Sequence, residues 1–146
     1  MCENHHVAAA YNLLKQKPLN IFENLSKDEY KIMRKWIVSM VLATDMAKHF
    51  PDLNKLNTMV KAEDFLVNTM SEEDKIFFMS MSVHMADLSN PTKEWLIGLK
   101  WAILLYEEFF TQGNTEKKLG IPVGNLTDKP NVNIAKQQVG FMKAIV

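Results

Sequence analysis

Apolar residues recur three or four positions apart along most of this chain, and this spacing constrains its fold more than any other feature. The first such stripe comprises Val7, Ala10, Tyr11 and Leu14. Side chains with this spacing share one face of an α-helix, whereas a half-buried strand alternates apolar and polar residues, a pattern that no segment sustains. The 146 residues have the length of one ordinary domain. We therefore predict an all-α fold, a compact multi-helix domain over residues 1–146.

Prolines and capping residues predict the bounds of the first two helices. Pro18 ends a helix over residues 3–16, because proline lacks the backbone N–H that an interior position needs. Ser26 and Glu29 have the spacing of a capping box, in which each side chain accepts a hydrogen bond from the backbone N–H of the other. The helix that follows is predicted to run to residue 50, where Pro51 closes it.

The middle of the chain carries one weak and one strong helical signal. Residues 53–60 form a helical stripe, and residues 65–67 add a second apolar patch without a clear break between them. Ser71 is a helix cap, and the acidic residues after it complement the helix dipole. Because residues 76–88 are almost all apolar or small, we predict a central helix that is buried on most sides.

The last third of the chain predicts a long helix, a long loop and a final helix. Thr92 is the expected cap of a helix over residues 93–112, and Gly113 is the expected left-handed residue after its end. A loop of about twenty residues then leads to a helix that begins near residue 133, and loops of that length are often functional. The inward face predicted for the long helix comprises Trp95, Leu96, Leu99, Ile103, Tyr106 and Phe110.

Charge, cysteine content and hydropathy exclude several classes of function. The 17 basic residues balance the 17 acidic ones, which gives no electrostatic basis for binding nucleic acid or an anionic membrane. The single cysteine, Cys2, excludes an internal disulfide and suits a reducing compartment, so we expect a cytoplasmic location. No apolar run approaches the roughly 18 residues of a membrane span, although segments outside this chain could attach the parent protein to a membrane.

A histidine, a carboxylate and an amide lie close together at the end of the predicted central helix. These residues are His84, Asp87 and Asn90. Burying Asp87 beside Met85 and Leu88 is costly unless a cation compensates its charge. That cation is either a metal ion or a buried Lys or Arg, and the residues alone leave both open. His84 and Asp87 share a helix face, so a shared metal is compatible with their spacing.

The sequence lacks the residue patterns of nucleophilic serine catalysis, of phosphate-binding loops and of closed zinc sites. No serine lies in a glycine-flanked elbow, no glycine-rich loop ends in Lys-Ser or Lys-Thr, and no cysteine and histidine cluster can close a zinc site. Carboxylate and histidine ligation for metal-assisted hydrolysis remains. Further ligands would come from His5, His6, Asp45 or residues outside the chain. On a helix, His5 and His6 point about 100° apart, and Asp45 either lies in a solvated turn or lines a cavity.

Five segments together resemble the catalytic domain of the class I cyclic nucleotide phosphodiesterases. In the order and spacing of that family, they are residues 3–6, 42–49, 84–91, 107–113 and 138–141. The resemblance implies an all-helical domain that hydrolyses the 3′,5′-phosphodiester of cyclic AMP or cyclic GMP to the 5′-monophosphate. It also implies divalent metals, Zn²⁺ with Mg²⁺ or Mn²⁺, which activate a bridging hydroxide.

The resemblance also implies roles for individual residues. Asp87 matches a metal ligand, whereas His84 does not, so His84 is expected to be a structural histidine. Gln138 and Asn90 match residues that hydrogen-bond the purine, and Phe141 matches the ring that stacks on it. The expected pocket walls are Met46, Leu105 and Phe109, and the expected neighbours of metal-bound water are Glu3 and Asp45.

The family's general-acid histidine and its other metal ligands lie upstream of the segment that contains Glu3. We therefore expect a partial catalytic domain that is inactive alone, with the cyclic nucleotide and the upstream part of its own domain as partners. The apolar run at residues 144–146 fits this expectation, because native termini usually taper into polar residues. Uncovered apolar faces on the His84 helix and the last helix predict self-association.

Two other functions remain compatible with the residues themselves. One is a non-catalytic nucleotide-binding or regulatory helical module, which would bind cyclic nucleotide without added metal. The other is a plain helical packing domain, in which the Met- and Leu-rich stripes only build a core. Such a packing domain would show no thermal shift with nucleotide and no sensitivity to Gln138→Ala.

Overall fold

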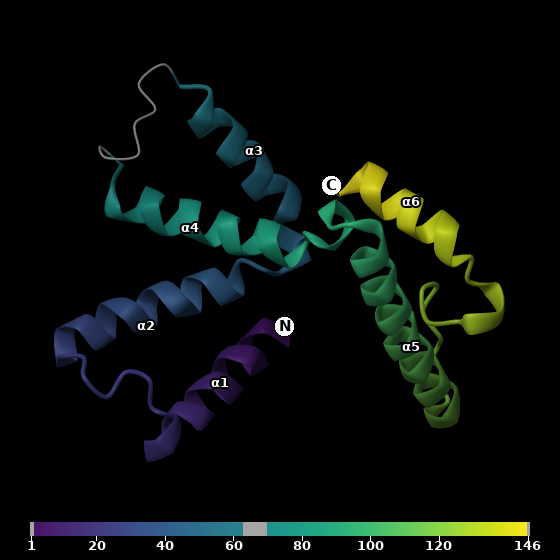
Figure 1. Ribbon diagram of the computed structural model, residues 1–146, viewed down its shortest axis with the longest axis horizontal. Coiled ribbons are helices and arrows are strands. Elements are labelled where there is room, and N and C mark those ends of the chain that lie inside the picture. The colour runs from purple at the N-terminus through teal and green to yellow at the C-terminus, as the bar shows by residue number, and fades with distance from the viewer. Residues whose placement is uncertain (1, 63–69, 146) are drawn as a thin grey trace. The chain divides into compact units, whose positions relative to one another are not determined.

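The computed structural model describes residues 2–62 and 70–145, and Figure 1 shows them as helices joined by turns and loops. In these ranges the α-helices are α1 (Cys2–Leu14), α2 (Lys27–Leu42), α3 (His49–Val60), α4 (Glu72–Asp87), α5 (Trp95–Leu119) and α6 (Ile134–Ala144). The same ranges contain no strand, which confirms the all-α prediction. None of the described helices is both long and apolar enough to cross a membrane. The apolar patch predicted at residues 65–67 lies outside the described residues.

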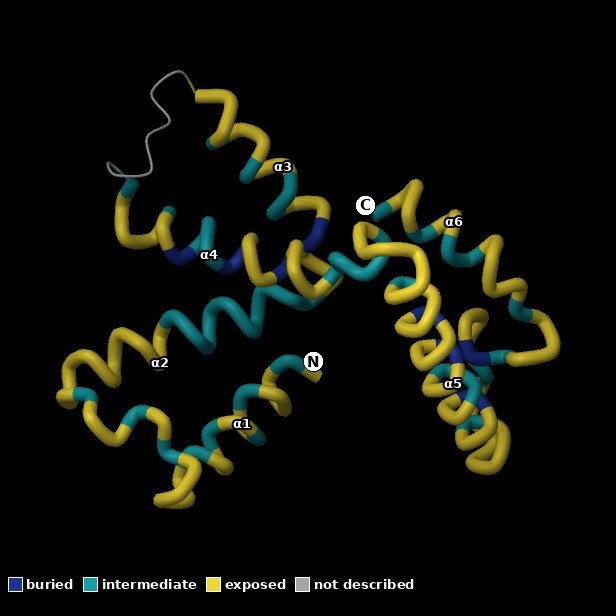
Figure 2. The backbone as a smooth tube through the Cα atoms, in the orientation of Figure 1, coloured by how far each residue is buried: buried dark blue, intermediate teal, exposed yellow. Residues whose placement is uncertain are grey.

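The chain divides into two compact units, Met1–Asp87 and Leu88–Val146. In the first unit, α2 packs against both α1 and α4, and α3 packs against α4 (Figure 1). The most deeply buried side chains of this unit are Ser80, Met81 and His84 of α4 and His49 of α3. Figure 2 shows buried stretches in dark blue along α4. Burying a side chain the size of Met81 contributes about 1.5–3 kcal/mol, so the contacts of α4 with its neighbours form the core of the unit.

The capping motifs predicted for the first unit are confirmed. Ser26 accepts a hydrogen bond from the backbone N–H of Glu29, whose carboxylate accepts one from the N–H of Ser26 at 2.8 Å. At the start of α4, the hydroxyl of Ser71 accepts a hydrogen bond from the N–H of Asp74 at 3.1 Å. These contacts are local, because each joins residues only three positions apart.

The predicted end of the second helix is wrong. α2 ends at Leu42, and a 3₁₀ turn over Met46–Lys48 separates it from α3, which contains Pro51 in its first turn. Asp45 begins the turn, since its carboxylate accepts a hydrogen bond from the N–H of Ala47 at 3.0 Å. Proline fits there because the first N–H groups of a helix have no partner within the helix.

The predicted burial of the central helix is also wrong in part. α4 buries one face, which carries Ile76, Ser80, Met81 and His84. Val83 and Met85 are 37% and 49% exposed, and Asp87 is exposed as well. Within the first unit, α2 and α3 pack on α4, and neither covers the sides of α4 that carry Val83 and Met85. The premise that Asp87 is a buried carboxylate therefore fails.

The second unit contains α5, a loop and α6. The predicted cap and end of α5 are wrong, and so is the predicted length of the loop. Thr92 does not cap α5, because its hydroxyl donates to the carbonyl oxygen of Ser89 and Glu94 precedes the helix. The helix continues through Gly113 to Leu119, and Gly120 ends it with a left-handed φ of 67°. The loop is accordingly shorter than predicted.

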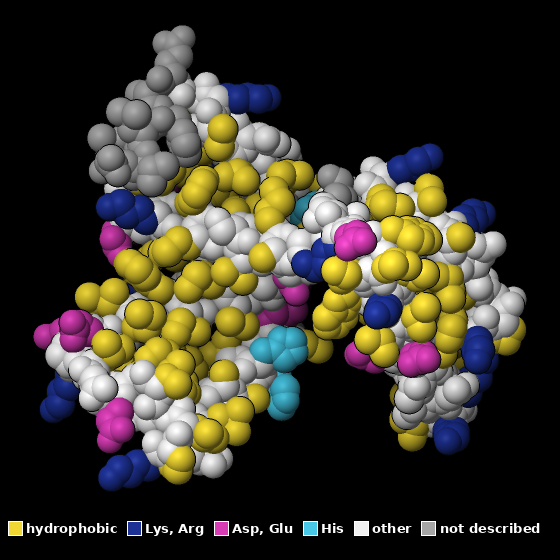
Figure 3. Space-filling view, viewed as in Figure 1, with side chains coloured by type: hydrophobic (Ala, Val, Ile, Leu, Met, Phe, Trp, Pro, Cys, Tyr) yellow, Lys and Arg dark blue, Asp and Glu magenta, His cyan; other side chains and the backbone are white. Residues whose placement is uncertain are grey.

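The predicted inward face of α5 is largely exposed. Trp95, Leu96 and Ile103 are 73%, 62% and 48% exposed, whereas Tyr106 is buried as expected. Figure 3 shows many hydrophobic side chains on the visible surface. Periodicity identifies which residues share a face, but an apolar face becomes buried only where another element covers it.

Candidate functional site

Asn90 and Gln138, the two predicted purine contacts, line one pocket of the second unit. The pocket has a volume of about 450 Å³ and lies between the 3₁₀ turn at Asn90–Thr92, the first turns of α5, and α6. Its other lining residues are mainly apolar: Pro91, Lys93, Trp95, Gly98, Leu99, Ala102, Ile134, Ala135, Val139 and Met142. An apolar hollow with a few converging polar groups is the usual form of a small-molecule site.

The amide of Asn90 is only half satisfied by the protein. Its Nδ2 donates a long hydrogen bond of 3.4 Å to the carbonyl oxygen of Gly98. Its Oδ1 is buried and has no hydrogen-bond partner in the described structure. A buried acceptor without a partner is costly, and a donor on a bound ligand would remove that cost.

Gln138 lies in the second turn of α6, where the helix is fixed by its cap. The side chain of Asn133 accepts a hydrogen bond from the backbone N–H of Lys136 at 3.0 Å and so begins α6. Gln138 is partly buried, which leaves part of its amide available in the pocket. An amide can donate and accept, so it can pair with different purine edges.

The structure does not bring the other predicted pocket residues into this hollow. Phe141 lies one turn beyond Gln138 and is partly buried, and Leu105 is 40% exposed on α5. Phe109 packs edge-on against Tyr106, with 5.8 Å between the ring centroids. Met46 belongs to the first unit and is 41% exposed.

The predicted acidic residues of the first unit stay on separate elements. Glu3 lies on α1, Asp45 caps the turn before α3, and Asp87 is the last residue of α4. His5 and His6 are exposed, with ring centroids 6.5 Å apart. Across residues 2–62 and 70–145, no group of three or more His, Cys, Asp and Glu side chains is placed to hold a metal ion.

His84 forms a buried pair with His49, a contact that the sequence reasoning missed. The Nδ1 of His49 and the Nε2 of His84 lie 2.9 Å apart, and both side chains are at least 95% buried. Burial lowers the pKa of His84, and charge on His49 lowers it further, whereas Asp87 and Asp52 act in the opposite direction. At this distance the rings form a hydrogen bond when one of the two facing nitrogens carries a proton and the other accepts it. Both histidines lie within the matched segments, but no local pattern indicates that they meet.

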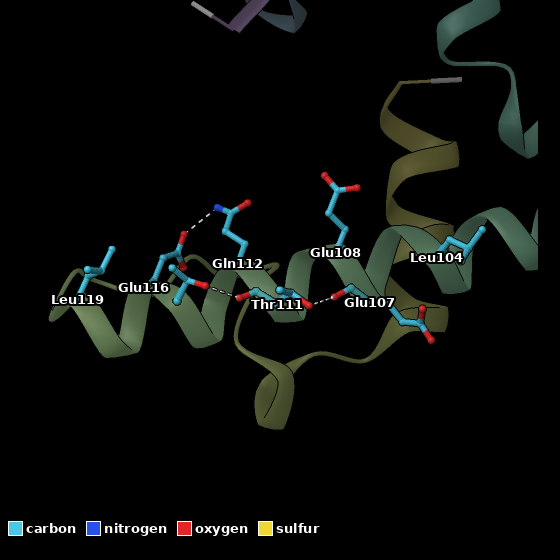
Figure 4. Close-up of a pocket in the computed structure, with 8 residues that line it drawn as sticks. Leu104, Glu107, Glu108, Thr111, Gln112, Glu116 and Leu119 are labelled. Carbon is cyan, nitrogen blue, oxygen red and sulfur yellow. Dashed lines mark hydrogen bonds between the residues drawn. The ribbon is translucent and has the colours of Figure 1, made fainter.

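A second missed residue, Glu116, lies at an open hollow along α5 that Figure 4 shows from the side. Its carboxylate accepts a hydrogen bond from Nε2 of Gln112 at 2.7 Å. It also accepts from the hydroxyl of Thr127 at 2.8 Å and the N–H of Gly124 at 3.2 Å. These hydrogen bonds lower the pKa of Glu116. The spacing of four between Gln112 and Glu116 is the only sign of this in the sequence.

Comparison with known proteins gives the same family from sequence and from structure. Residues 1–146 match the model of the family described as 3′5′-cyclic nucleotide phosphodiesterase. The human dual specificity calcium/calmodulin-dependent 3′,5′-cyclic nucleotide phosphodiesterase 1B is 39% identical over 144 residues, which are 99% of this chain and 26% of that protein. The Drosophila melanogaster phosphodiesterase 1 of the same description is 36% identical over 99% of this chain and 16% of its own length.

Among solved structures, the phosphodiesterase domain of Salpingoeca rosetta rhodopsin phosphodiesterase superposes with a TM-score of 0.88 at 32% identity. The superposition covers 98% of this chain and 44% of that domain's chain. The chain thus spans about a quarter of the human relative and less than half of the solved domain.

Proposed function

The chain belongs to the 3′,5′-cyclic nucleotide phosphodiesterase family, and we propose that it supplies the purine-binding part of a catalytic domain that hydrolyses cyclic AMP and cyclic GMP. The observation that carries this proposal is the pocket shared by Asn90 and Gln138. Family membership favours it over a non-catalytic nucleotide-binding module and over a packing domain.

In the proposed complex, the amides of Gln138 and Asn90 hydrogen-bond the purine and Phe141 stacks on it. The unpartnered Oδ1 of Asn90 supports a ligand donor at that position. Met46, Leu105 and Phe109 are proposed walls of the complete pocket. Because relatives of this chain are named dual specificity enzymes and an amide pairs with either purine by rotating, we propose that both cyclic nucleotides are substrates.

Membership of the family implies dependence on divalent metal ions. The described residues do not form a metal centre by themselves. We propose that Asp87 supplies one ligand, since its carboxylate is exposed and makes no hydrogen bond or ion pair with the described residues. Glu3 and Asp45 would contact metal-bound water. When bound, Zn²⁺ with Mg²⁺ or Mn²⁺ would activate the attacking hydroxide.

The proposed partner is the rest of the catalytic domain, which the relatives have and these residues do not span. The exposed apolar residues of α5 support this proposal, because a face that carries Trp95 and Leu96 is costly to leave in water. We propose a cytoplasmic location for the complete enzyme. Without its partner the chain would self-associate, and sedimentation velocity should then show oligomers.

The experiment that tests this function measures hydrolysis of cyclic AMP and cyclic GMP by the complete enzyme that carries this chain. We expect hydrolysis of both, loss of activity with a chelator, and recovery with added Zn²⁺ and Mg²⁺. Gln138→Ala should raise KM for both nucleotides, whereas Gln137→Ala, one residue away and outside the pocket lining, should not. Full activity with the chelator present, or equal KM values for the two variants, would contradict the proposal.

A further inference from the structure

The loop between α5 and α6 lies directly against the α5 backbone at Gly113. A Cβ atom built on this glycine would overlap the backbone carbonyl of Thr127. Gly113 and Thr127 are both buried, although most of the surrounding loop is exposed. A glycine inside a helix lowers the stability of the helix. At Gly113 the absence of a Cβ atom leaves the room that the backbone of Thr127 occupies.

One turn further along α5, Glu116 holds the same part of the loop by hydrogen bonds. Its Oε2 accepts from the hydroxyl of Thr127 and from the N–H of Gly124, and its Oε1 accepts from Gln112. The N–H groups of Thr127 and Asp128 both donate to the carbonyl oxygen of Gly124, at 3.0 and 3.2 Å. The turn is therefore closed on itself and tied to α5 as one piece.

The hydrogen bonds continue from this turn to the start of α6. The Nζ of Lys117 forms an ion pair with Asp128 at 2.7 Å. The other carboxylate oxygen of Asp128 accepts from Nδ2 of Asn131, in the 3₁₀ turn that leads to α6. Asn133 then caps α6. These contacts follow one another along the chain, from Lys117 of α5 through residues 128–131 to the cap of α6.

No residue of α6 is fully buried, although Gln138 and Phe141 are partly buried. Packing therefore holds α6 less firmly than it holds α4, which has four buried residues. The loop is the covalent connection that sets where α6 lies along α5. Gln138 enters the pocket from α6, while Gly98 and Ala102 enter it from α5. A shift of α6 along α5 would therefore move the Gln138 amide relative to Asn90.

We propose that Glu116 is a positioning residue for purine recognition: by tying the turn over residues 124–128 to α5, it sets the place of Gln138 in the pocket. This inference rests on the proposed function of the pocket. Glu116 itself does not line the pocket and is not expected to contact the nucleotide.

The test compares Glu116→Ala with Glu116→Gln and with Glu107→Ala in the complete enzyme. Glu107 is an exposed carboxylate of the same helix whose side chain makes no hydrogen bond to the loop. Glu116→Ala should raise KM for cyclic AMP about fivefold to tenfold with kcat nearly unchanged, the size expected for one or two lost hydrogen bonds. Glu116→Gln keeps an acceptor for the loop and should restore most of the affinity.

Hydrogen exchange of the α6 amides gives a readout that does not depend on activity. Exchange in α6 should speed up in Glu116→Ala and stay unchanged in Glu107→Ala. If Glu116→Ala fails to fold, Thr127→Val removes the hydroxyl contacts with Glu116 and with the carbonyl oxygen of Gly124, leaves the contact of Gly124 N–H with Glu116, and should show the same changes at smaller size. Equal KM and exchange in Glu116→Ala and Glu107→Ala would overturn the positioning role. An inactive wild type would instead contradict the proposed function, and exchange would still decide whether Glu116 fixes α6.

Discussion

In the second unit, Asn90 and Gln138 line a common pocket, whereas in the first unit Glu3, Asp45 and Asp87 belong to three separate elements. The pocket is formed by the 3₁₀ turn at Asn90–Thr92 and the two helices α5 and α6 that follow it, and contacts such as Glu116 with Thr127 hold the loop between these helices against α5. The proposed metal centre would combine Asp87 with further ligands, which the described residues do not place beside it. The proposed purine site is thus contained within one short unit, whereas the proposed metal site depends on more of the domain.

The largest difference between the units should be seen in kcat. In the complete enzyme, Asp87→Ala should lower kcat by about 1000-fold, since a metal centre supplies several kcal/mol of transition-state stabilisation. Asp28→Ala is the matched control, because Asp28 is an exposed carboxylate of the first unit that pairs only with Lys31 on its own helix. Steady-state kinetics with saturating metal measure both. A kcat for Asp87→Ala within tenfold of wild type would contradict the metal-ligand proposal.

Changes in the second unit should act on KM instead. Asn90→Ala should raise KM for cyclic AMP by about tenfold, because it removes a hydrogen bond to the purine worth roughly 1 kcal/mol or more. Asn114→Ala, at an exposed position of α5 outside the turn over residues 124–128, should leave KM unchanged. If Asn90→Ala lowers kcat at constant KM, the proposed assignment of purine binding to the second unit and metal binding to the first is wrong.

The buried histidine pair should make stability depend on pH. Because burial lowers the pKa of His84 in the fold, the unfolded chain binds more protons in the range just below the unfolded pKa. Stability from this group is therefore fully present above about pH 6.5 and is lost as pH falls through the folded pKa. Urea unfolding at several pH values should show this fall in wild type and a weaker fall in His84→Gln. Identical pH profiles would show that the pair does not control stability.

The smallest expected effects are those of removing one helix cap in each unit. Ser26→Ala and Asn133→Ala should each lower stability by about 1 kcal/mol, the usual cost of losing an N-cap. Only Asn133→Ala should also raise KM, because it loosens the start of the helix that carries Gln138. Thermal unfolding and steady-state kinetics on both variants test this. A rise in KM of the same size in Ser26→Ala would mean that general destabilisation, not the position of α6, sets nucleotide affinity.

Local signals predicted the helices and much of their capping, and tertiary contacts explain the errors. The caps at Ser26 and Ser71 were predictable because their partners lie three residues away. The end of α2 was mispredicted because a proline can follow the end of one helix or lie in the first turn of the next. Here Asp45 caps the turn before α3, and Pro51 lies in the first turn of α3. Gly113 was predicted to follow the end of a helix, but it lies inside α5. Glycine is needed there because a side chain would overlap the backbone of Thr127 in the loop.

The candidate site was predicted from the order of matched segments more than from chemistry. No spacing rule places Asn90 and Gln138 in one pocket, which both residues line in the structure. The buried charge inferred for Asp87 was wrong, since apolar neighbours in the sequence do not cover it in space. His49 was missed because its partner, His84, lies on a different helix.

The most direct test is turnover of cyclic AMP by the purified 146-residue chain with Zn²⁺ and Mg²⁺ present. We predict no hydrolysis above the rate without protein, because the described residues offer one proposed metal ligand and no metal centre. The complete enzyme, measured in the same buffer, should hydrolyse the nucleotide. Turnover by the purified chain that disappears in Asp87→Ala would show that these residues assemble the metal site themselves and would contradict the division between the two units.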